Sequence, residues 1–134
     1  MFHFLRRFAF KKREEPSPNE EPHDARGLNK RGVRHIHAGR REAARADFQA
    51  ALALDASYAP AMMNLGNLAF ESGDAAEAVR WYEAAIAADP EYPLVHANLA
   101  SAFKKLGRYE DAVRAMRHAS KLEVRPRRKP SRRR

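Results

Sequence analysis

The chain has 134 residues, enough for one domain, and no cysteine, which excludes disulfide bonds, thiolate catalysis and cysteine-ligated metal. No apolar run reaches the length of a membrane span. The net charge of +9 lies at the two ends: residues 1–13 carry +5 and 125–134 carry +7, whereas 14–24 carry −5 and 25–124 only +2. This asymmetry indicates anionic partners for the ends rather than for the middle of the chain.

Residues 1–13, MFHFLRRFAFKKR, combine basic side chains with Phe2, Phe4, Phe8 and Phe10. Charges interrupt the apolar part and no cleavage site follows, so this segment is not predicted to be a signal peptide. As a short basic amphipathic helix it would contact a membrane interface. Two alternatives stay open: it docks on the helices that follow, or it is disordered.

An acidic linker leads into six predicted helices. Residues 14–24, EEPSPNEEPHD, contain three prolines, a composition typical of a flexible linker. From residue 25 onward, apolar residues recur at the i, i+3, i+4 spacing of amphipathic helices, as at Met62, Leu65 and Leu68. The predicted helices form pairs at 25–38 with 41–54, 59–72 with 75–88, and 93–106 with 109–123.

Small residues recur along these helices with a period of 34 residues, which divides the chain into repeats 25–58, 59–92 and 93–126. The columns are Gly39, Gly73 and Gly107; Ala44, Ala78 and Ala112; and Ala51, Ala85 and Ala119. A further column has Gly32, Gly66 and Ala100, and we expect it to let paired helices approach closely. The larger side chains of Phe48, Tyr82 and Met116 are expected to fill the space beside it.

This pattern resembles the tetratricopeptide repeat family. The middle repeat carries the family signature as Met62, Leu65-Gly66, Ala69 with Phe70 beside it, Ala78, Tyr82, Ala85 and Pro90. The first repeat departs from it at Arg31 and His35, where leucine and an aromatic residue are usual. The resemblance implies an all-α fold over residues 25–124, an α-solenoid of three antiparallel helix pairs wound into a right-handed superhelix. Stacking is needed because one pair cannot bury its apolar face alone.

The resemblance also implies a concave groove lined by the first helix of each pair. The residues expected there are Asn29, Lys30, Val33, Met63, Asn64, Asn67, Phe70, Asn98, Ser101, Lys104 and Lys105. Asn64 and Asn98 occupy the same repeat position, where some family members hold a peptide backbone with asparagines. An amide suits this task because it offers donors and an acceptor. The alternative is that both asparagines make only local hydrogen bonds.

A carboxylate clamp for chaperone C-termini, another use of the family, is not predicted. The corresponding positions hold Asn29, Val33, Asn64, Leu94 and Asn98, and only Asn64 matches the residues that the clamp needs. A different acidic ligand would meet the basic side chains of this groove, unless these side chains are simply a solvated surface.

No catalytic constellation emerges from the sequence. His35 and His37 are two apart, so on a helix they point to different faces and do not chelate one metal easily. Glu110 and Asp111 are adjacent, yet nothing indicates a shielded pair of carboxyl groups. We therefore predict no enzymatic activity, no catalytic residue, no cofactor and no metal site.

The last predicted helix and the residues after it differ from the rest. His118 and Ser120 replace the apolar residues of earlier repeats, as the outer face of a terminal repeat requires. The tail 125–134, RPRRKPSRRR, has no apolar residue and is predicted to be disordered. Its basic residues, which would bind nucleic acid weakly or an anionic surface unless the tail only aids solubility, are Arg125, Arg127, Arg128, Lys129, Arg132, Arg133 and Arg134.

The sequence thus predicts a scaffold or adaptor that binds a peptide or protein segment in the groove. One alternative is a nucleic-acid or ribosome-associated protein held by the tail 125–134. Another is a membrane-surface adaptor anchored by residues 1–13. We expect a cytoplasmic location, peripheral to the membrane in the last case, and the oligomeric state stays open.

Overall fold

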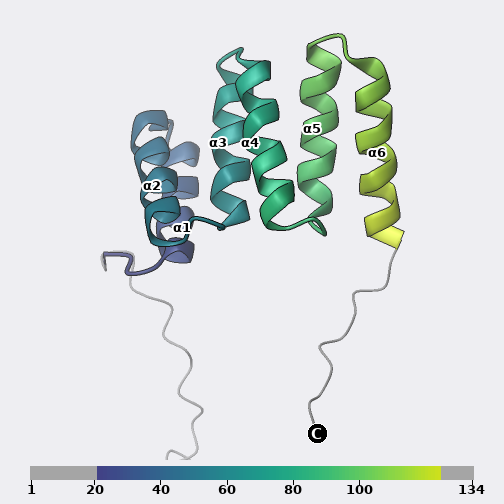
Figure 1. Cartoon of the computed structure of the whole chain (residues 1–134). Coiled ribbons are helices and arrows are strands. Elements are labelled where there is room, and N and C mark those ends of the chain that lie inside the picture. Colours follow the sequence, from purple (N-terminus) through teal and green to yellow (C-terminus); the bar gives the residue numbers. More distant parts are fainter. Residues whose placement is uncertain (1–20, 125–134) are drawn as a thin grey trace, which may run out of the picture.

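The computed structural model describes residues 21–124, which fold into six helices and no strand (Figure 1). The helices are α1 Ala25–His37, α2 Arg41–Leu54, α3 Ala59–Glu71, α4 Ala75–Ala88, α5 Pro93–Lys105 and α6 Tyr109–Val124. They pack as three antiparallel pairs, so the predicted all-α arrangement of helix pairs is confirmed. The segments 1–13 and 125–134 and most of the linker 14–24 lie outside the described residues, and the functions expected of them stay predictions.

Helix starts follow from capping residues in the sequence. Asp24 accepts a hydrogen bond from the backbone N–H of Gly27 at the start of α1. Asp74 accepts one from the N–H of Glu77 at the start of α4, as its spacing predicts. In α3 a proline lies in the first turn, where a missing N–H costs nothing.

The turn inside each helix pair depends on a glycine. Gly39, Gly73 and Gly107 have φ angles of 76°, 89° and 75°, in the left-handed region that other residues rarely adopt. Each glycine lies two residues after the end of the first helix of its pair. This conformation lets the chain reverse into the second helix, which explains the glycine column.

Within each pair the two helices touch through a small residue and a large one. A Cβ atom built on Gly32 would lie 2.5 Å from Cε1 of Phe48, and one built on Gly66 would lie 2.6 Å from Cε1 of Tyr82. Phe48 and Tyr82 are 1% and 2% exposed. The expected packing of glycine against an aromatic ring is therefore confirmed in the first two pairs.

The pairs stack through α2 against α3 and α4 against α5. One buried cluster joins the first two pairs, and another joins the second and third pairs. In the described part of the chain, none of the helices combines the length and apolar character needed to cross a membrane. The first helices α1, α3 and α5 also meet along one face, as the hydrogen bonds described next show.

The polar residues expected on the outer surface of α6, Ser120 and His118, are both exposed, but they lie on different sides of the helix. The His118 ring stacks on His96 of α5 with 5.7 Å between ring centroids, so it faces the preceding helix. Ser120 lies on the other side of α6, beside exposed Val113 and Met116. Residues two apart on a helix point to different faces, which is why the two positions do not act together.

Candidate functional site

Four asparagines connect the first helices of the three pairs. The Asn64 side chain on α3 donates from Nδ2 to Oδ1 of Asn29 on α1, at 2.9 Å. The Asn98 side chain on α5 donates from Nδ2 to Oδ1 of Asn67 on α3, at 3.1 Å. All four are half-buried. We call these residues, Asn29, Asn64, Asn67 and Asn98, the amide face.

Asn64 and Asn98 are equivalent by the repeat, yet they bond to different partners. Asn98 reaches a residue 31 positions earlier, Asn67. The residue 31 positions before Asn64 is Val33, which has no side-chain acceptor. Asn64 instead bonds to Asn29, which lies 35 positions earlier in the chain. The residue 35 positions before Asn98 is Met63, which is buried and has no amide. The identity of the neighbour therefore decides each bond.

Part of the hydrogen-bonding capacity of the amide face is already in use. The Asn67 oxygen accepts a second bond, from the hydroxyl of Tyr82 at 2.6 Å. Within residues 21–124, Oδ1 of Asn64 and Oδ1 of Asn98 accept no bond from the protein. No side-chain nitrogen or oxygen in that range is both buried and unpaired, so these two oxygens reach solvent. Each can accept a hydrogen bond from a ligand.

The other residues predicted for the groove divide by burial. Met63 is 7% exposed and packs in the core, so it supports this face from beneath. Val33 and Phe70 are half-buried. The exposed members are Lys30, Ser101, Lys104 and Lys105. Of these, Lys104 lines a cavity together with residues of α6.

The raised pKa of Tyr82 predicts that the stability of the fold depends on pH. Burial, with a smaller contribution from Glu71, raises the pKa of Tyr82 from 10 to about 12. Its contribution to stability is therefore fully present below pH 10 and is lost as the pH rises from 10 to 12. Urea unfolding across this range should show a steeper loss of stability for the wild type than for Tyr82→Phe. If stability falls equally steeply with pH in both proteins, Tyr82 is not the group responsible.

A charged cluster between α1 and α2 was not identified in the sequence. Arg31 donates to buried Asp47 through two bonds, Nε to Oδ2 at 2.9 Å and Nη2 to Oδ1 at 2.8 Å. His35 Nε2 lies 3.6 Å from the same carboxylate, and Glu21 accepts a bond from Arg31 at 2.7 Å. Hydrogen bonds to Asp47, and then to Glu21, raise the pKa of Arg31.

This cluster explains why the first repeat departs from the usual pattern at Arg31 and His35. Both side chains surround Asp47, which is only 6% exposed. A buried carboxylate needs such partners. The signal that could have identified the cluster is three polar residues at positions that are apolar in both later repeats. Among residues 21–124, no group of three or more histidine, aspartate or glutamate side chains is placed to hold a metal ion.

Two family models match the chain, each described as tetratricopeptide repeat, over residues 29–93 and 69–127. Cellulose synthase operon protein C of Komagataeibacter sucrofermentans is 39% identical over 75 residues, which cover 55% of this chain and 6% of that protein. Its counterpart in Komagataeibacter xylinus has 47% identity over 60 residues, which cover 45% of this chain and 5% of that protein. The chain thus spans only a small fraction of these relatives.

Solved structures share the fold. MamA superposes with a TM-score of 0.69 at 25% identity, over 75% of this chain and 58% of that chain. The second tetratricopeptide repeat domain of Spaghetti (RPAP3), solved with the HSP90 peptide SRMEEVD, gives a TM-score of 0.70 at 22% identity, over 74% and 92% of the two chains.

Proposed function

Because this chain belongs to the tetratricopeptide repeat family, whose domains are typically non-catalytic protein-interaction modules, we propose that it binds an extended peptide segment of a partner protein on the amide face. The observation that carries the proposal is the row of half-buried asparagines whose remaining acceptors, at Asn64 and Asn98, reach solvent. Every residue of an extended peptide except proline presents a backbone N–H and a carbonyl. The amide face supplies the complementary acceptors and donors along the domain.

The internal hydrogen bonds of the amide face favour such a role. Asn64 and Asn98 are each held by one bond to a neighbouring helix. Their orientation is fixed before a ligand arrives, so little side-chain entropy is lost on binding. Lys30 and Lys105, which the family pattern assigns to the same groove, are exposed cations and favour a ligand with acidic residues. A carboxylate clamp of the chaperone type is not part of the proposal, since only Asn64 matches it.

Changing Asn64 and Asn98 together to alanine is expected to weaken peptide binding about tenfold or more, since each hydrogen bond contributes about 0.5–1.5 kcal/mol. The probe is a peptide selected from a random displayed library against the full-length chain, with affinity measured by fluorescence anisotropy. Helicity by circular dichroism should stay unchanged.

The matched control is Gln49→Ala, which removes an exposed amide from α2 and should leave affinity unchanged. Side-chain amide resonances of Asn64 and Asn98 should shift on titration with the peptide. Equal affinity of the double variant, or shifts confined to α2, α4 and α6, would contradict the proposed function.

A further inference from the structure

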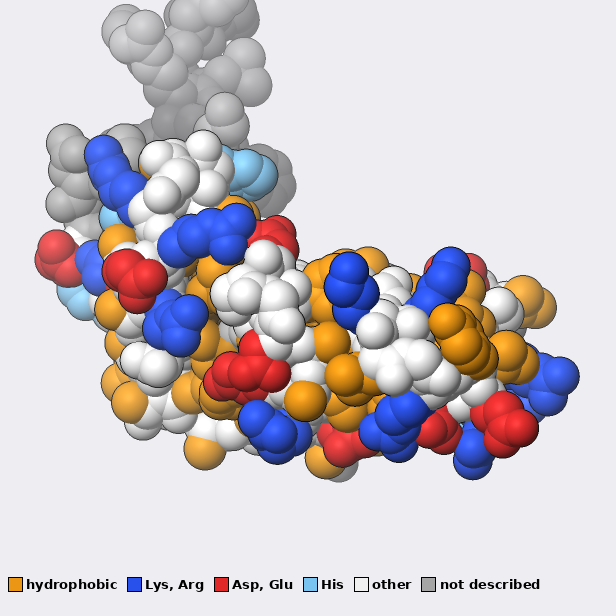
Figure 2. All heavy atoms as spheres, turned by 90° about the horizontal axis from the view of Figure 1, so that it is seen from above, with side chains coloured by type: hydrophobic (Ala, Val, Ile, Leu, Met, Phe, Trp, Pro, Cys, Tyr) orange, Lys and Arg blue, Asp and Glu red, His pale blue; other side chains and the backbone are white. Residues whose placement is uncertain are grey.

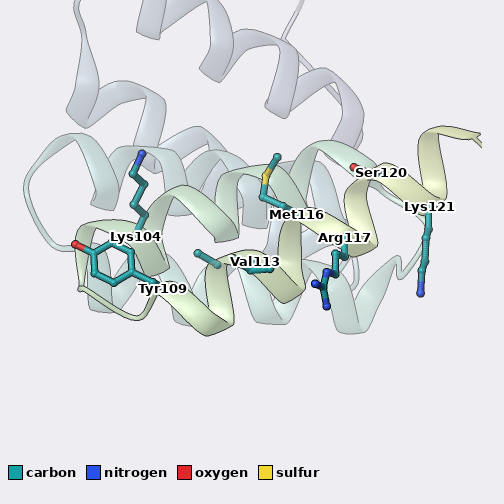
Figure 3. Close-up of a pocket in the computed structure, with 8 residues that line it drawn as sticks. Lys104, Tyr109, Val113, Met116, Arg117, Ser120 and Lys121 are labelled. Carbon is teal, nitrogen blue, oxygen red and sulfur yellow. The ribbon is translucent and has the colours of Figure 1, made fainter.

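The free side of α6 carries the largest group of exposed apolar side chains at one end of the domain. Tyr109, Val113 and Met116 are 64%, 51% and 49% exposed and line a cavity of about 620 Å³. In Figure 3 they lie along α6, with Lys104 of α5 near one end and Lys121 near the other. We call this surface, with Lys104, Arg117 and Lys121 at its margin, the α6 face.

Comparison with the preceding repeat indicates which structural element fits the α6 face. The positions of Tyr109, Val113 and Met116 correspond to Ala75, Val79 and Tyr82 in α4, one repeat of 34 residues earlier. Those three residues are 6%, 6% and 2% exposed, and Val79 and Tyr82 share a buried cluster with residues of α5. In the described part of the chain no helix follows α6. The surface that is exposed on α6 is therefore the one that receives a helix on α4.

The repeat requires a large apolar side chain at the position of Met116, where Phe48 and Tyr82 are buried, but not at the positions of Tyr109 and Val113. The corresponding positions in α2 hold Arg41 and Arg45, both exposed although α3 follows. A terminal helix could carry arginine at the same positions and gain solubility. Tyr109 and Val113 leave apolar surface in water instead, a feature of interaction sites on monomeric proteins.

The charges around the α6 face determine which kind of helix would bind there. All charged side chains that line the cavity are cations, namely Lys104, Arg117 and Lys121, and none forms an ion pair within residues 21–124. Figure 2 shows the same end of the molecule from above, where hydrophobic side chains lie beside lysine and arginine and also beside aspartate and glutamate. The segment 1–13 carries +5 and would be repelled by these cations. A second copy of α6 carries as many carboxylates, Glu110, Asp111 and Glu123, as lysines and arginines, so it complements the cations less well than an acidic helix does.

We propose that the α6 face binds an acidic amphipathic helix of a partner protein, which takes the place on α6 that α5 takes on α4. Its apolar stripe covers Tyr109, Val113 and Met116, and glutamate or aspartate on its flanks meets the cations. This site is separate from the amide face, so the domain holds two partners at once, an extended peptide and a helix.

Two synthetic helical peptides test the proposal. Both carry the same apolar stripe at i, i+3, i+4 and i+7, flanked by glutamates in one and by lysines in the other. The acidic peptide is expected to bind the full-length chain about tenfold or more tightly than the basic one at low salt, with the difference shrinking as salt screens the charges. Equal binding of the two, or no binding of either, would overturn the proposal.

Variants locate the site. Val113→Thr with Met116→Gln keeps side-chain size on an exposed surface and should abolish binding of the acidic peptide. Arg117→Gln with Lys121→Gln should remove the preference for acidic flanks. Asn64→Ala with Asn98→Ala should leave this binding unchanged, which separates the proposal from the one for the amide face.

Other occupants give different results. Sedimentation of the full-length chain should show no self-association that depends on Val113 and Met116. A dimer that the Val113→Thr and Met116→Gln changes dissociate would make a second copy the occupant. Tighter binding of a peptide with the sequence of residues 1–13 than of the acidic peptide would assign the α6 face to that segment. Either result would overturn the proposal.

Discussion

Replacing Gly66 by alanine is expected to lower the free energy of unfolding by up to about 2 kcal/mol, although alanine is the better helix former by about 1 kcal/mol. The new Cβ would lie 2.6 Å from Cε1 and 2.8 Å from Cδ1 of Tyr82, distances that require the ring to move. Tyr82 is 2% exposed and its hydroxyl is bonded to Asn67. Overpacking of this kind costs about 1–3 kcal/mol, which outweighs the gain in helix propensity.

The third repeat supplies the control for this prediction. There Ala100 replaces the glycine and Met116 replaces the tyrosine, and the pair folds in the same way. Methionine is unbranched and adapts to an irregular space. Adding Tyr82→Met to Gly66→Ala should therefore cost less than adding it to the wild type, as measured by urea unfolding of all four proteins. Strictly additive costs would show that the methyl group and the ring do not compete for space.

Structural features that are set within a single repeat could be predicted from the sequence. The glycine column at 39, 73 and 107 marks turns whose φ angles other residues rarely adopt, and the column at 32 and 66 marks contact with an aromatic ring. Each is a local requirement that recurs every 34 residues, in three copies for the turn and in two for the ring contact, so the copies reinforce one another. The six helices and their pairing followed from these columns.

The bonding of individual side chains could not be predicted in this way. Equivalent positions suggest equivalent partners, yet Asn64 bonds to Asn29 and Asn98 to Asn67, because the partners differ from repeat to repeat. Met63 was placed in the groove by the family pattern, and it is buried. A period gives the position of a residue along the helix, whereas burial and bonding depend on which neighbours lie across from it.

The Asp47 cluster is the clearest case of such a dependence. Arg31 and His35 depart from the pattern on α1, and the reason lies 16 residues from Arg31, on α2. Position 47 corresponds to Trp81 and Ala115 in the later repeats, so the carboxylate replaces an apolar or aromatic side chain. The three polar residues act together, and no single one of them indicates the others.

Replacing Asp47 by alanine is therefore expected to lower the free energy of unfolding by about 2–3 kcal/mol, less than the 3–5 kcal/mol typical of a fully buried pair. The Asp47 side chain is 8% exposed, whereas that of Arg31 is 30% exposed and keeps its bond to Glu21. Water can reach part of the guanidinium when the carboxylate is gone, which reduces the cost. The loss of two charge-assisted bonds accounts for the remainder.

The third repeat again provides the matched variant. Leu99 and Ala115 stand where the first repeat has Arg31 and Asp47, so Arg31→Leu with Asp47→Ala copies an apolar pair that the same fold already accommodates. Because apolar replacement of an ion pair is often neutral or stabilising, the double variant should recover at least half of the loss seen for Asp47→Ala. Arg31→Leu alone leaves the carboxylate beside His35 only and should be less stable than the double variant. If the double variant is no more stable than Asp47→Ala in urea unfolding, the loss comes from missing side-chain volume and not from a stranded charge.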